Sequence, residues 1–489
     1  MQTASPPVPG ILSQTAAVSA GAVVARCVSV VRGVALARLL DPTGYGQLNG
    51  LLLVAEYGDR SHLGTLNAMG RNAPISIGAG DLEEAEAIAG AALFVTLCTS
   101  TIVTVGILIA AILSPWPMKQ RIALALMGPV VFCSQLHLFQ NILARTRLRM
   151  HLMSGLRMWN AVAQLVFAVG CGFLWGLPGV VGGVAIGTLL TVILGNRRLG
   201  GYPRIKTDWA RVKGLLRIGL PLVWITSMYT VLESLGRIAV LRWLGTAQLG
   251  QFAIALVAVS VMAFIPSAVG QVLSPRIMRA YGRKETQGVE FLLREPILLL
   301  GLLLPIVGGI GAVAMPWAVA TFLPRFEAAI VPGQILLLNF TPYALRAFSS
   351  EVLVASSRLY RIALLQSLGI VLLAGLVAIS LTMGWGIVGV AGSTAIVYWA
   401  YGVSMMAAAL RVRRKQPGEI ARFVSSALIP TVWIAFVCVF LRLAAASLDK
   451  NVASLGWSMV SVLTIALASS PLLWFAIQRL KLLRRAQSQ

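Results

Sequence analysis

The chain has 489 residues, of which 58% are hydrophobic and only 11% are charged, and its mean hydropathy is +0.84. Water-soluble globular proteins carry about 25% charged residues, so this composition excludes that class and indicates a protein that crosses a membrane many times. Forty Lys and Arg residues against sixteen Asp and Glu residues give a net charge of +24. No basic run outside the apolar segments is interleaved with stacking aromatic residues, so we expect no nucleic-acid partner.

Fourteen apolar runs are long enough to cross about 30 Å of hydrocarbon as helices. Alternation over short segments, which is typical of membrane β-barrels, is absent. The sequence therefore predicts an all-α polytopic membrane protein with fourteen transmembrane helices. In chain order the predicted spans are residues 11–39, 46–70, 87–113, 120–145, 153–176, 178–195, 214–244, 248–275, 294–315, 328–355, 361–382, 384–410, 420–445 and 454–477.

The basic residues between these spans predict the orientation of the chain. Positive clusters occur in every second loop, at residues 145–151, 196–213, 279–284, 358–361 and 411–415, and in the tail at 479–485. The intervening loops hold only scattered charges. Because cytoplasmic loops carry the excess of Lys and Arg, we expect both termini in the cytoplasm, with membrane lipids as partners of the basic segments.

An internal repeat organises the predicted spans. The segment "RLLDPTGYGQ" at 38–47 aligns with "RWLGTAQLGQ" at 242–251 at a constant offset of 204 residues. Both copies lie where the first span of a six-helix half gives way to its second, so the two halves share one orientation and form a parallel repeat. We therefore predict an N-terminal six-helix lobe at 1–200, a C-terminal six-helix lobe at 201–412, and two additional helices with a basic tail at 413–489.

Motifs for catalysis are absent from the sequence. We find no G-x-x-x-x-G-K-[ST] loop, no H-E-x-x-H and no C-x-x-C spacing, and no extramembrane segment large enough to hold a catalytic centre. The five cysteines all fall inside apolar spans, where small packing roles are the common case. The sequence therefore predicts a protein that is not an enzyme and has no cofactor and no metal site.

The first predicted span contains three arginines. Arg26 lies near its middle, Arg32 about 9 Å further out and Arg38 close enough to the surface to reach interfacial water. An arginine at the centre of a membrane helix costs roughly 2.5 to 3.5 kcal/mol. Such a residue normally faces a water-filled path or an ionic partner.

The second predicted span carries Glu56, Asp59 and Arg60. At spacings of three and four residues these side chains share one face of a continuous helix. That helix returns inward, which brings Glu56 and Asp59 to roughly the depth of Arg26. Two interpretations remain open: structural ion pairs that hold the helices in register, and the wall of a hydrated, net positive cavity between the two lobes.

The second lobe repeats this theme. Glu233 and Arg237 are four residues apart in the seventh span, where they can pair within one helix. Arg346 and Glu351 in the tenth span are weaker candidates, because they fall close to the predicted cytoplasmic mouth of a cavity.

The opening of the chain resembles a known family. The stretch "RGVALARLLDPTGYGQLNGLLLVAEYGDRSHLGTLNAMGRNAPISIGAGDLEEAEAI" is similar to the start of bacterial lipid-linked oligosaccharide flippases, the Wzx-type polysaccharide transporters. The shared features are an arginine-bearing first helix, an L-x-P-x-x-Y-G turn, a G-x-x-x-A-x-x-R element and an acidic cytoplasmic loop. "LLRIGLPLVW" at 215–224 resembles the family's seventh helix. The motif-level match covers residues 25–90 and 214–255.

This resemblance implies the fold of the multidrug/oligosaccharidyl-lipid/polysaccharide superfamily and a place in the bacterial inner membrane. It implies transport of undecaprenyl-pyrophosphate-linked oligosaccharide from the cytoplasmic to the periplasmic leaflet, for O-antigen, exopolysaccharide or another surface polysaccharide, beside a polysaccharide polymerase and other assembly proteins. Arginine donates paired N–H groups to phosphate oxygens. The implied head-group contacts are Arg26, Arg32, Arg60 and Arg237, and the implied sites for a coupling proton or sodium ion are Glu56, Asp59 and Glu233.

Three alternatives stay open at this stage. A lipid II flippase of the same superfamily also has fourteen helices and cavity arginines, although the "LDPTGYG" turn favours the polysaccharide branch. A multidrug exporter is expected to have twelve spans and a less cationic cavity. A non-transporting scaffold of a polysaccharide assembly complex needs no polar cavity at all.

Overall fold

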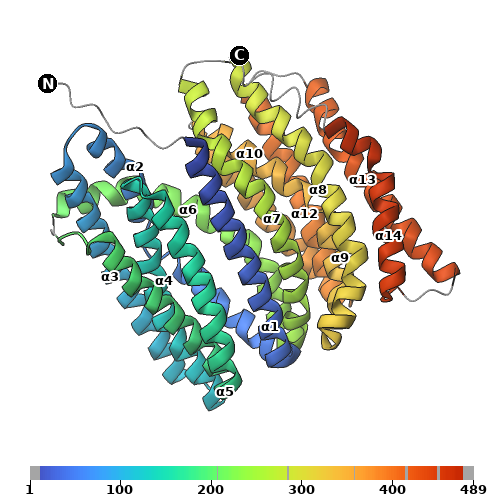
Figure 1. Ribbon diagram of the computed structural model, residues 1–489, viewed down its shortest axis with the longest axis horizontal. Coiled ribbons are helices and arrows are strands. Elements are labelled where there is room, and N and C mark those ends of the chain that lie inside the picture. The colour runs from blue at the N-terminus through green and yellow to red at the C-terminus, as the bar shows by residue number, and fades with distance from the viewer. Residues whose placement is uncertain are drawn as a thin grey trace. The chain divides into compact units, whose positions relative to one another are not determined.

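The computed structural model describes residues 11–205, 208–282, 286–356, 358–412, 417–448 and 452–476, and every regular element within these ranges is a helix (Figure 1). Both chain ends, and part of the basic loop at 411–415, lie outside the described residues. The elements are α1 (Ile11–Gly58), α2 (Thr65–Gly78), α3 (Leu82–Leu113), α4 (Met118–Thr146), α5 (Met150–Leu199), α6 (Trp209–Ala239), the π-helix η1 (Val240–Leu244), α7 (Gly245–Gly282), α8 (Thr286–Phe322), the 3₁₀ turn η2 (Pro324–Ala329), α9 (Ile330–Leu338), α10 (Thr341–Ala355), α11 (Leu359–Thr382), α12 (Gly386–Val412), α13 (Pro417–Ser447) and α14 (Leu455–Ala468).

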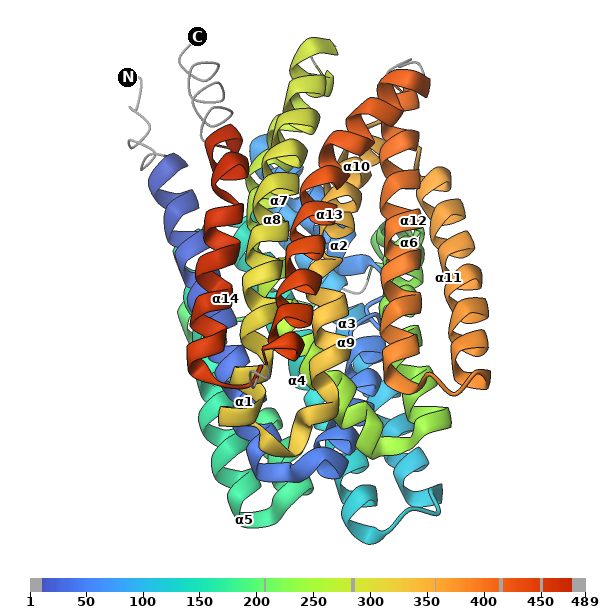
Figure 2. The same cartoon turned by 90° about the vertical axis from the view of Figure 1, so that its right-hand side faces the viewer.

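The chain divides into two compact units. The first comprises Met1–Leu40 and Gln47–Thr230, and the second comprises Asp41–Gly46 and Val231–Gln489. In the first unit α3, α4 and α5 pack side by side around a core that includes Phe139 and Leu143. In the second unit α11 lies against α12, and α13 and α14 pack on α8 (Figure 2).

The described helices have the length and apolarity that membrane crossing requires. Eight segments qualify among these residues, or ten if each of two bent helix pairs is one span. One of the eight, 150–199, contains two of the spans predicted from the sequence, and 209–263 contains the predicted span 214–244 and the first part of 248–275. The protein is therefore an all-α membrane protein with fourteen α-helices in its described part, while a count of fourteen complete crossings stays a prediction.

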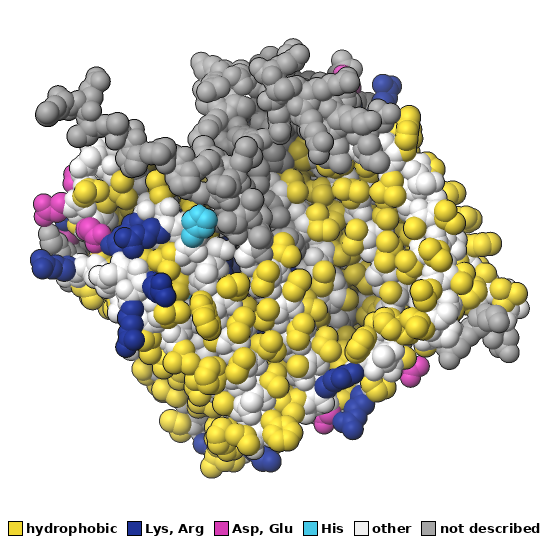
Figure 3. All heavy atoms as spheres, viewed as in Figure 1, with side chains coloured by type: hydrophobic (Ala, Val, Ile, Leu, Met, Phe, Trp, Pro, Cys, Tyr) yellow, Lys and Arg dark blue, Asp and Glu magenta, His cyan; other side chains and the backbone are white. Residues whose placement is uncertain are grey.

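The surface agrees with a lipid environment. On the face drawn in Figure 3 apolar side chains cover most of the described surface, and Lys and Arg side chains gather in a few places near its edges. Large apolar side chains such as Leu113, Phe173 and Leu467 are exposed. In water such continuous apolar surface would favour aggregation, so hydrocarbon is the solvent that it fits.

Helix α1 breaks at Asp41, where φ is 58° and ψ is 175°. The following Pro42 disfavours the α-helical conformation for the residue before it. The Asp41 carboxylate accepts a hydrogen bond of 2.7 Å from the Gly44 N–H, as an N-cap does, and so starts the second part of the helix. The "LDPTGYG" turn therefore separates the first two predicted spans inside one continuous element.

The same break occurs 204 residues later. Gly245 has φ 85° and ψ 177° and ends η1 just before α7. Five residues beyond each break, Gly46 and Gly250 pack directly against each other in the second unit. A β-carbon on Gly46 would lie 1.7 Å from the carbonyl oxygen of Thr246, so only glycine permits this backbone contact. The aligned segments thus share an unusual backbone conformation as well as a sequence pattern.

Helix α5 is a hairpin rather than one rod. Its backbone leaves the helical region at Gly176, with φ 62° and ψ −137°, inside the predicted "WGLPG" break. Along the returning arm Gly179, Gly183 and Gly187 recur every four residues and meet the outgoing arm backbone to backbone. A β-carbon on Gly183 would lie 2.2 Å from the carbonyl oxygen of Phe167. Small residues at this spacing let membrane helices approach closely.

The second predicted span is interrupted, which corrects the expectation of a continuous helix over 46–70. Helix α1 ends at Gly58, residues 59–64 form turns, and α2 begins at Thr65. Leu63 and Gly64 have positive φ values of 49° and 79°. Gly64 lies against Gly219 of α6, where a β-carbon would be 2.1 Å from the Gly219 carbonyl oxygen.

This interruption is internally satisfied. The Gly58 carbonyl accepts hydrogen bonds of 2.9 Å from both the Ser61 N–H and the Gln135 side chain. The His62 imidazole accepts one of 3.0 Å from the Gly64 N–H, and His62 itself is buried. Non-helical backbone at membrane depth is tolerated only where it is buried in protein or lines a polar cavity. Within 59–64, His62 and Gly64 are buried in protein and so meet that condition.

Candidate functional site

The arginines of the first helix lie in the first unit. Arg26 and Arg32 are half-buried and Arg38 is exposed. The Arg32 guanidinium donates a hydrogen bond to the side-chain oxygen of Gln164 in α5. Gln164 in turn donates one of 2.9 Å to the Thr188 hydroxyl across the α5 hairpin. Arg32 is therefore held by a neutral polar network, with the glycine-lined hairpin setting the distance between Gln164 and Thr188.

The charged residues of the second span are split by the break described above. Glu56 is on α1, whereas Asp59 and Arg60 lie in the turns that follow, so the predicted single helical face for these three side chains is wrong. The helix ends at Gly58, and the positive φ values at Leu63 and Gly64 separate the turns from α2, which begins at Thr65. All three side chains are half-buried. Glu56 and Arg60 are both close enough to Asp59 to interact with it electrostatically.

Arg60 also reaches a second helix. Its guanidinium donates a hydrogen bond of 2.9 Å to the Thr230 hydroxyl of α6. Together with the Gly64 and Gly219 contact, this bond fixes the turn against α6 inside the first unit. The structure thus brings Glu56, Asp59 and Arg60 into one neighbourhood by a turn instead of a helix.

The predicted residues of the second unit form a separate group. Glu233 is exposed and Arg237 half-buried on α6, and Arg346 and Glu351 are half-buried on α10. The Arg346 guanidinium lies 4.8 Å from the centre of the Tyr343 ring, a cation–π distance. Arg346 and Glu233 both act electrostatically on the buried Tyr401. Arg346 and Glu233, far apart in sequence, therefore lie near one aromatic hydroxyl.

Several residues of these networks carry no signal in the sequence. Gln164, Thr188 and Thr230 are single polar residues in apolar helices, where a neutral side chain is usually satisfied by its own backbone. Thr230 illustrates this, because its hydroxyl also donates to the Thr226 carbonyl. Gln164 and Thr230 are distinguished only by accepting from an arginine, and Thr188 only by accepting from Gln164; both are properties of the tertiary fold.

A group of ion pairs lies at the start of α3, in the acidic loop noted from the sequence. The Asp81 carboxylate caps the helix by accepting from the Glu84 N–H at 2.8 Å. Arg211 of α6 holds the Glu84 carboxylate through contacts of 2.8 to 3.2 Å, and Arg147 pairs with Glu86 at 2.5 Å. These partly exposed pairs connect the ends of α3, α4 and α6 within the first unit.

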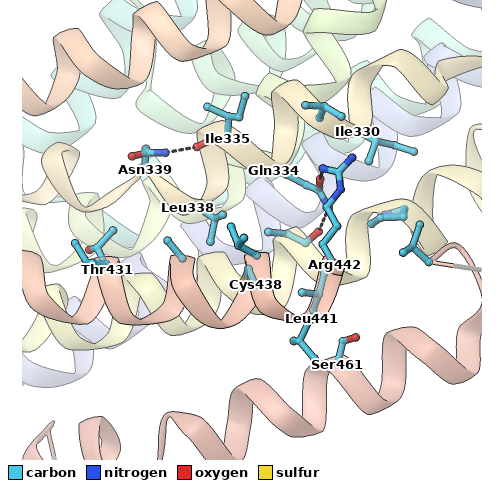
Figure 4. Close-up of a pocket in the computed structure, with 18 of the residues that line it drawn as sticks. Ile330, Gln334, Ile335, Leu338, Asn339, Thr431, Cys438, Leu441, Arg442 and Ser461 are labelled. Atoms are coloured by element: carbon cyan, nitrogen blue, oxygen red, sulfur yellow. Dashed lines mark hydrogen bonds between the residues drawn. The ribbon is translucent and has the colours of Figure 1, made fainter. Parts of the chain in front are cut away.

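A cavity of about 700 Å³ opens in the second unit among α8, α9, α12, α13 and α14 (Figure 4). Most of its wall is apolar. Asn339 and Thr431 lie at one end, and Arg442 and Ile330 lie at the other. The Arg442 guanidinium is 3.4 Å from the side-chain oxygen of Gln334. Sequence analysis missed this cavity, because its residues come from these five helices, from η2 and from two loops, and are individually unremarkable.

Metal binding finds no support in the described residues, which contain no cluster of three or more His, Cys, Asp or Glu side chains suited to an ion. The charged groups above are arginines and scattered carboxylates. Such an arrangement suits contacts to an anion and exchange of a single proton or cation.

Comparisons with known proteins agree with this architecture. Residues 35–323, more than half of the chain, match the model of a family described as "Polysaccharide biosynthesis protein". A search of curated proteins gave no match. The polysaccharide biosynthesis family covers the first helix break, the acidic loop and the first helices of the second predicted lobe.

Solved structures are similar over most of the chain. A MOP superfamily transporter from Pyrococcus furiosus, described as having a binding pocket of reverse polarity, shows 13% identity and a TM-score of 0.59 over 90% of this chain and 96% of its own. An aspartate-to-asparagine mutant of the MATE transporter VcmN from Vibrio cholerae shows 15% identity and a TM-score of 0.63 over 83% of this chain and 97% of its own. An outward-facing MATE family multidrug resistance transporter of the MOP superfamily shows 13% identity and a TM-score of 0.60 over 84% of this chain and 96% of its own.

At these identities the structures establish the fold alone, whereas the family match establishes kinship. The chain therefore belongs to the polysaccharide biosynthesis protein family and has the fold of the MOP superfamily transporters to which it is similar.

Proposed function

We propose that this protein moves an undecaprenyl-pyrophosphate-linked oligosaccharide from the cytoplasmic to the periplasmic leaflet of a bacterial inner membrane, for surface polysaccharide assembly. The observation that carries the proposal is the polysaccharide biosynthesis family match over 35–323, on a chain whose fold is that of transporters. A polysaccharide is built from lipid-linked units, and a transporter in that process has such a unit as its natural substrate. A polymerase and other assembly proteins would take up the product.

The arginines support a pyrophosphate as the group that is recognised. Arg32 already donates to a neutral amide, and Arg60 to a neutral hydroxyl. Phosphate oxygens carry charge and accept shorter, roughly twice stronger hydrogen bonds from guanidinium, so a pyrophosphate can compete with these neutral acceptors. We assign head-group contacts to Arg26, Arg32 and Arg60, with Arg237 in the second unit as a further contact.

The carboxylates supply a candidate for energy coupling. Glu56 and Asp59 lie beside Arg60, so their charge state sets the net charge of this neighbourhood. A proton or a sodium ion on Asp59 would leave Arg60 less neutralised and therefore more attractive to an anion. Glu233 is proposed for the same role in the second unit, while Arg346 and Glu351 remain weaker candidates at a cavity mouth.

Alternating access is the transport mechanism that we propose. Its support is the shared helix break at Asp41 and Gly245, which suits two parallel six-helix lobes, at 1–200 and 201–412, followed by the additional helices at 413–489. Breaks at equivalent positions give each lobe a bend in its first helix pair. Both chain termini are proposed to be cytoplasmic, as the loop charges predict.

Surface polysaccharide in a deletion strain tests this function. Strains complemented with the intact protein, Arg26→Ala, Arg26→Lys or Arg38→Ala are compared for polymer export, with membrane protein levels measured in parallel. We expect Arg26→Ala to abolish export, Arg26→Lys to restore it partly because lysine loses the paired donor geometry, and Arg38→Ala to be mild because Arg38 is exposed.

The outcomes also separate the alternative functions. Full export by Arg26→Ala at a normal protein level would contradict a role for this cation in substrate recognition. Loss of growth on deletion, rescued by a lipid II flippase, would favour the lipid II alternative, and loss of drug resistance with intact polysaccharide would favour a drug exporter. Export by a variant that cannot move lipid in vitro would favour a scaffold.

A further inference from the structure

The cavity of Figure 4 has the depth of one membrane leaflet. It runs along α13 from Thr431 to Arg442, eleven residues that span about 16 Å at 1.5 Å per residue. Half of a hydrocarbon core of about 30 Å is nearly the same length. Because the basic loop at 411–415 precedes α13 and is predicted to be cytoplasmic, the Arg442 end lies at the predicted periplasmic side.

The wall between these ends suits hydrocarbon. Leu338, Ala435, Cys438 and Val439 line its length. Beside it α13 and α14 are joined to α8 by a close-packed apolar cluster that includes Ile434 and Ile465, both fully buried. Leu338, Cys438 and Leu441 belong both to this packing and to the wall of the cavity, whose volume is about 700 Å³.

Opposite charges line the outer end of this cavity. Arg442 contacts Gln334 at 3.4 Å, a long distance for a hydrogen bond. Glu327 belongs to η2, three residues before Ile330, which Figure 4 shows beside Arg442. Both charged side chains are exposed. A ligand that reaches this end therefore meets a cation and a carboxylate together.

We propose that this cavity binds a periplasmic-leaflet phospholipid with a zwitterionic phosphoethanolamine head group. Its phosphate contacts Arg442, its ammonium group contacts Glu327, and one acyl chain lies along α13 towards Thr431. A head group with both signs satisfies both side chains, whereas a purely anionic lipid or a polyprenyl pyrophosphate places its negative charge beside the Glu327 carboxylate. The bound lipid joins α13 and α14 to η2 and α9, whichever substrate the protein transports.

Native mass spectrometry of the full-length protein tests this site. The delipidated protein is incubated with phosphatidylethanolamine, phosphatidylglycerol or undecaprenyl phosphate, and the retained adducts are quantified. We expect retention of phosphatidylethanolamine, and about tenfold weaker retention in Arg442→Ala, as the loss of one charge-assisted hydrogen bond implies. Arg325→Ala is the matched control. Arg325 is an exposed arginine of η2, the turn that contains Glu327, and it does not line the cavity.

Two further variants probe the cavity and its polarity. Ala435→Trp fills the cavity and should abolish the adduct, whereas Ala446→Trp, on the exposed surface of α13, should not. Arg442→Glu alone and Glu327→Arg alone should each weaken binding. The double variant, which exchanges the two charges, should restore it. Preferential retention of phosphatidylglycerol or undecaprenyl phosphate would overturn the zwitterionic assignment. An adduct unaffected by Ala435→Trp, or no adduct on the intact protein, would overturn the site.

Discussion

Replacing Gly64 by alanine tests the interrupted second span most sharply. Gly64 has a φ of 79°, and a β-carbon there would lie 2.1 Å from the Gly219 carbonyl oxygen. The left-handed backbone costs a non-glycine residue about 1 to 2 kcal/mol, and an added group in a close-packed contact costs about 1 to 3 kcal/mol. We therefore expect Gly64→Ala to lower the free energy of unfolding by about 2 to 5 kcal/mol.

Gly80 provides the matched control. Its φ is 82°, almost that of Gly64, but nothing lies within 4 Å of its added β-carbon. Gly80→Ala should therefore show only the backbone cost of about 1 to 2 kcal/mol. Alanine also reduces the freedom of the unfolded chain, and this effect cancels between the two variants. The difference between them isolates the contact with Gly219.

Thermal and denaturant unfolding of the purified protein in detergent, followed by tryptophan fluorescence, gives the comparison. Equal losses of stability in Gly64→Ala and Gly80→Ala would refute the backbone contact between α2 and α6. A larger loss in Gly64→Ala, together with reduced export, would show that the position of the 59–64 turn matters for transport as well as for stability.

Three other predictions concern the α5 hairpin, the α3 ion pair and the topology. Gly183→Leu should lower the unfolding temperature because the two arms of α5 can no longer touch, while Gly170→Leu, with open space around it, should not; equal effects would contradict the hairpin packing. Arg211→Ala should lower the unfolding midpoint only slightly, as expected for an exposed ion pair, and the loss should vanish in high salt; a salt-independent loss would contradict an electrostatic role for this pair. After removal of the native cysteines, Ile205→Cys should resist an impermeant thiol reagent in intact cells and Met118→Cys should react, because the loop charges place these positions on opposite sides; external labelling of position 205 would overturn the orientation.

Local sequence signals anticipated the breaks that proline and glycine create. The "WGLPG" motif marked the reversal of α5 at Gly176, and the aligned segments at offset 204 marked the paired breaks at Asp41 and Gly245. In each case a proline or a glycine acts on its own neighbours. Such effects are readable without knowledge of the tertiary structure.

The break at 59–64 escaped prediction because its cause is distant. Residues 59–64 contain no proline, and Gly64 is needed there because it meets Gly219, which is 155 residues away in the sequence. The same holds for Gln164, whose amide became part of the candidate site only through Arg32. Charged residues within apolar spans stand out in a sequence, but the neutral residues that hold them do not.

The central claim is that this protein moves a pyrophosphate-linked glycan across a bilayer. Proteoliposomes with the purified protein and a lipid-linked oligosaccharide in the inner leaflet measure this directly, since an enzyme added outside modifies only glycans that have crossed. We predict rapid modification with the intact protein, little with Arg26→Ala, and none in protein-free liposomes. A rate with the intact protein no greater than that of protein-free liposomes, under an imposed proton or sodium gradient of either direction, would contradict the claim.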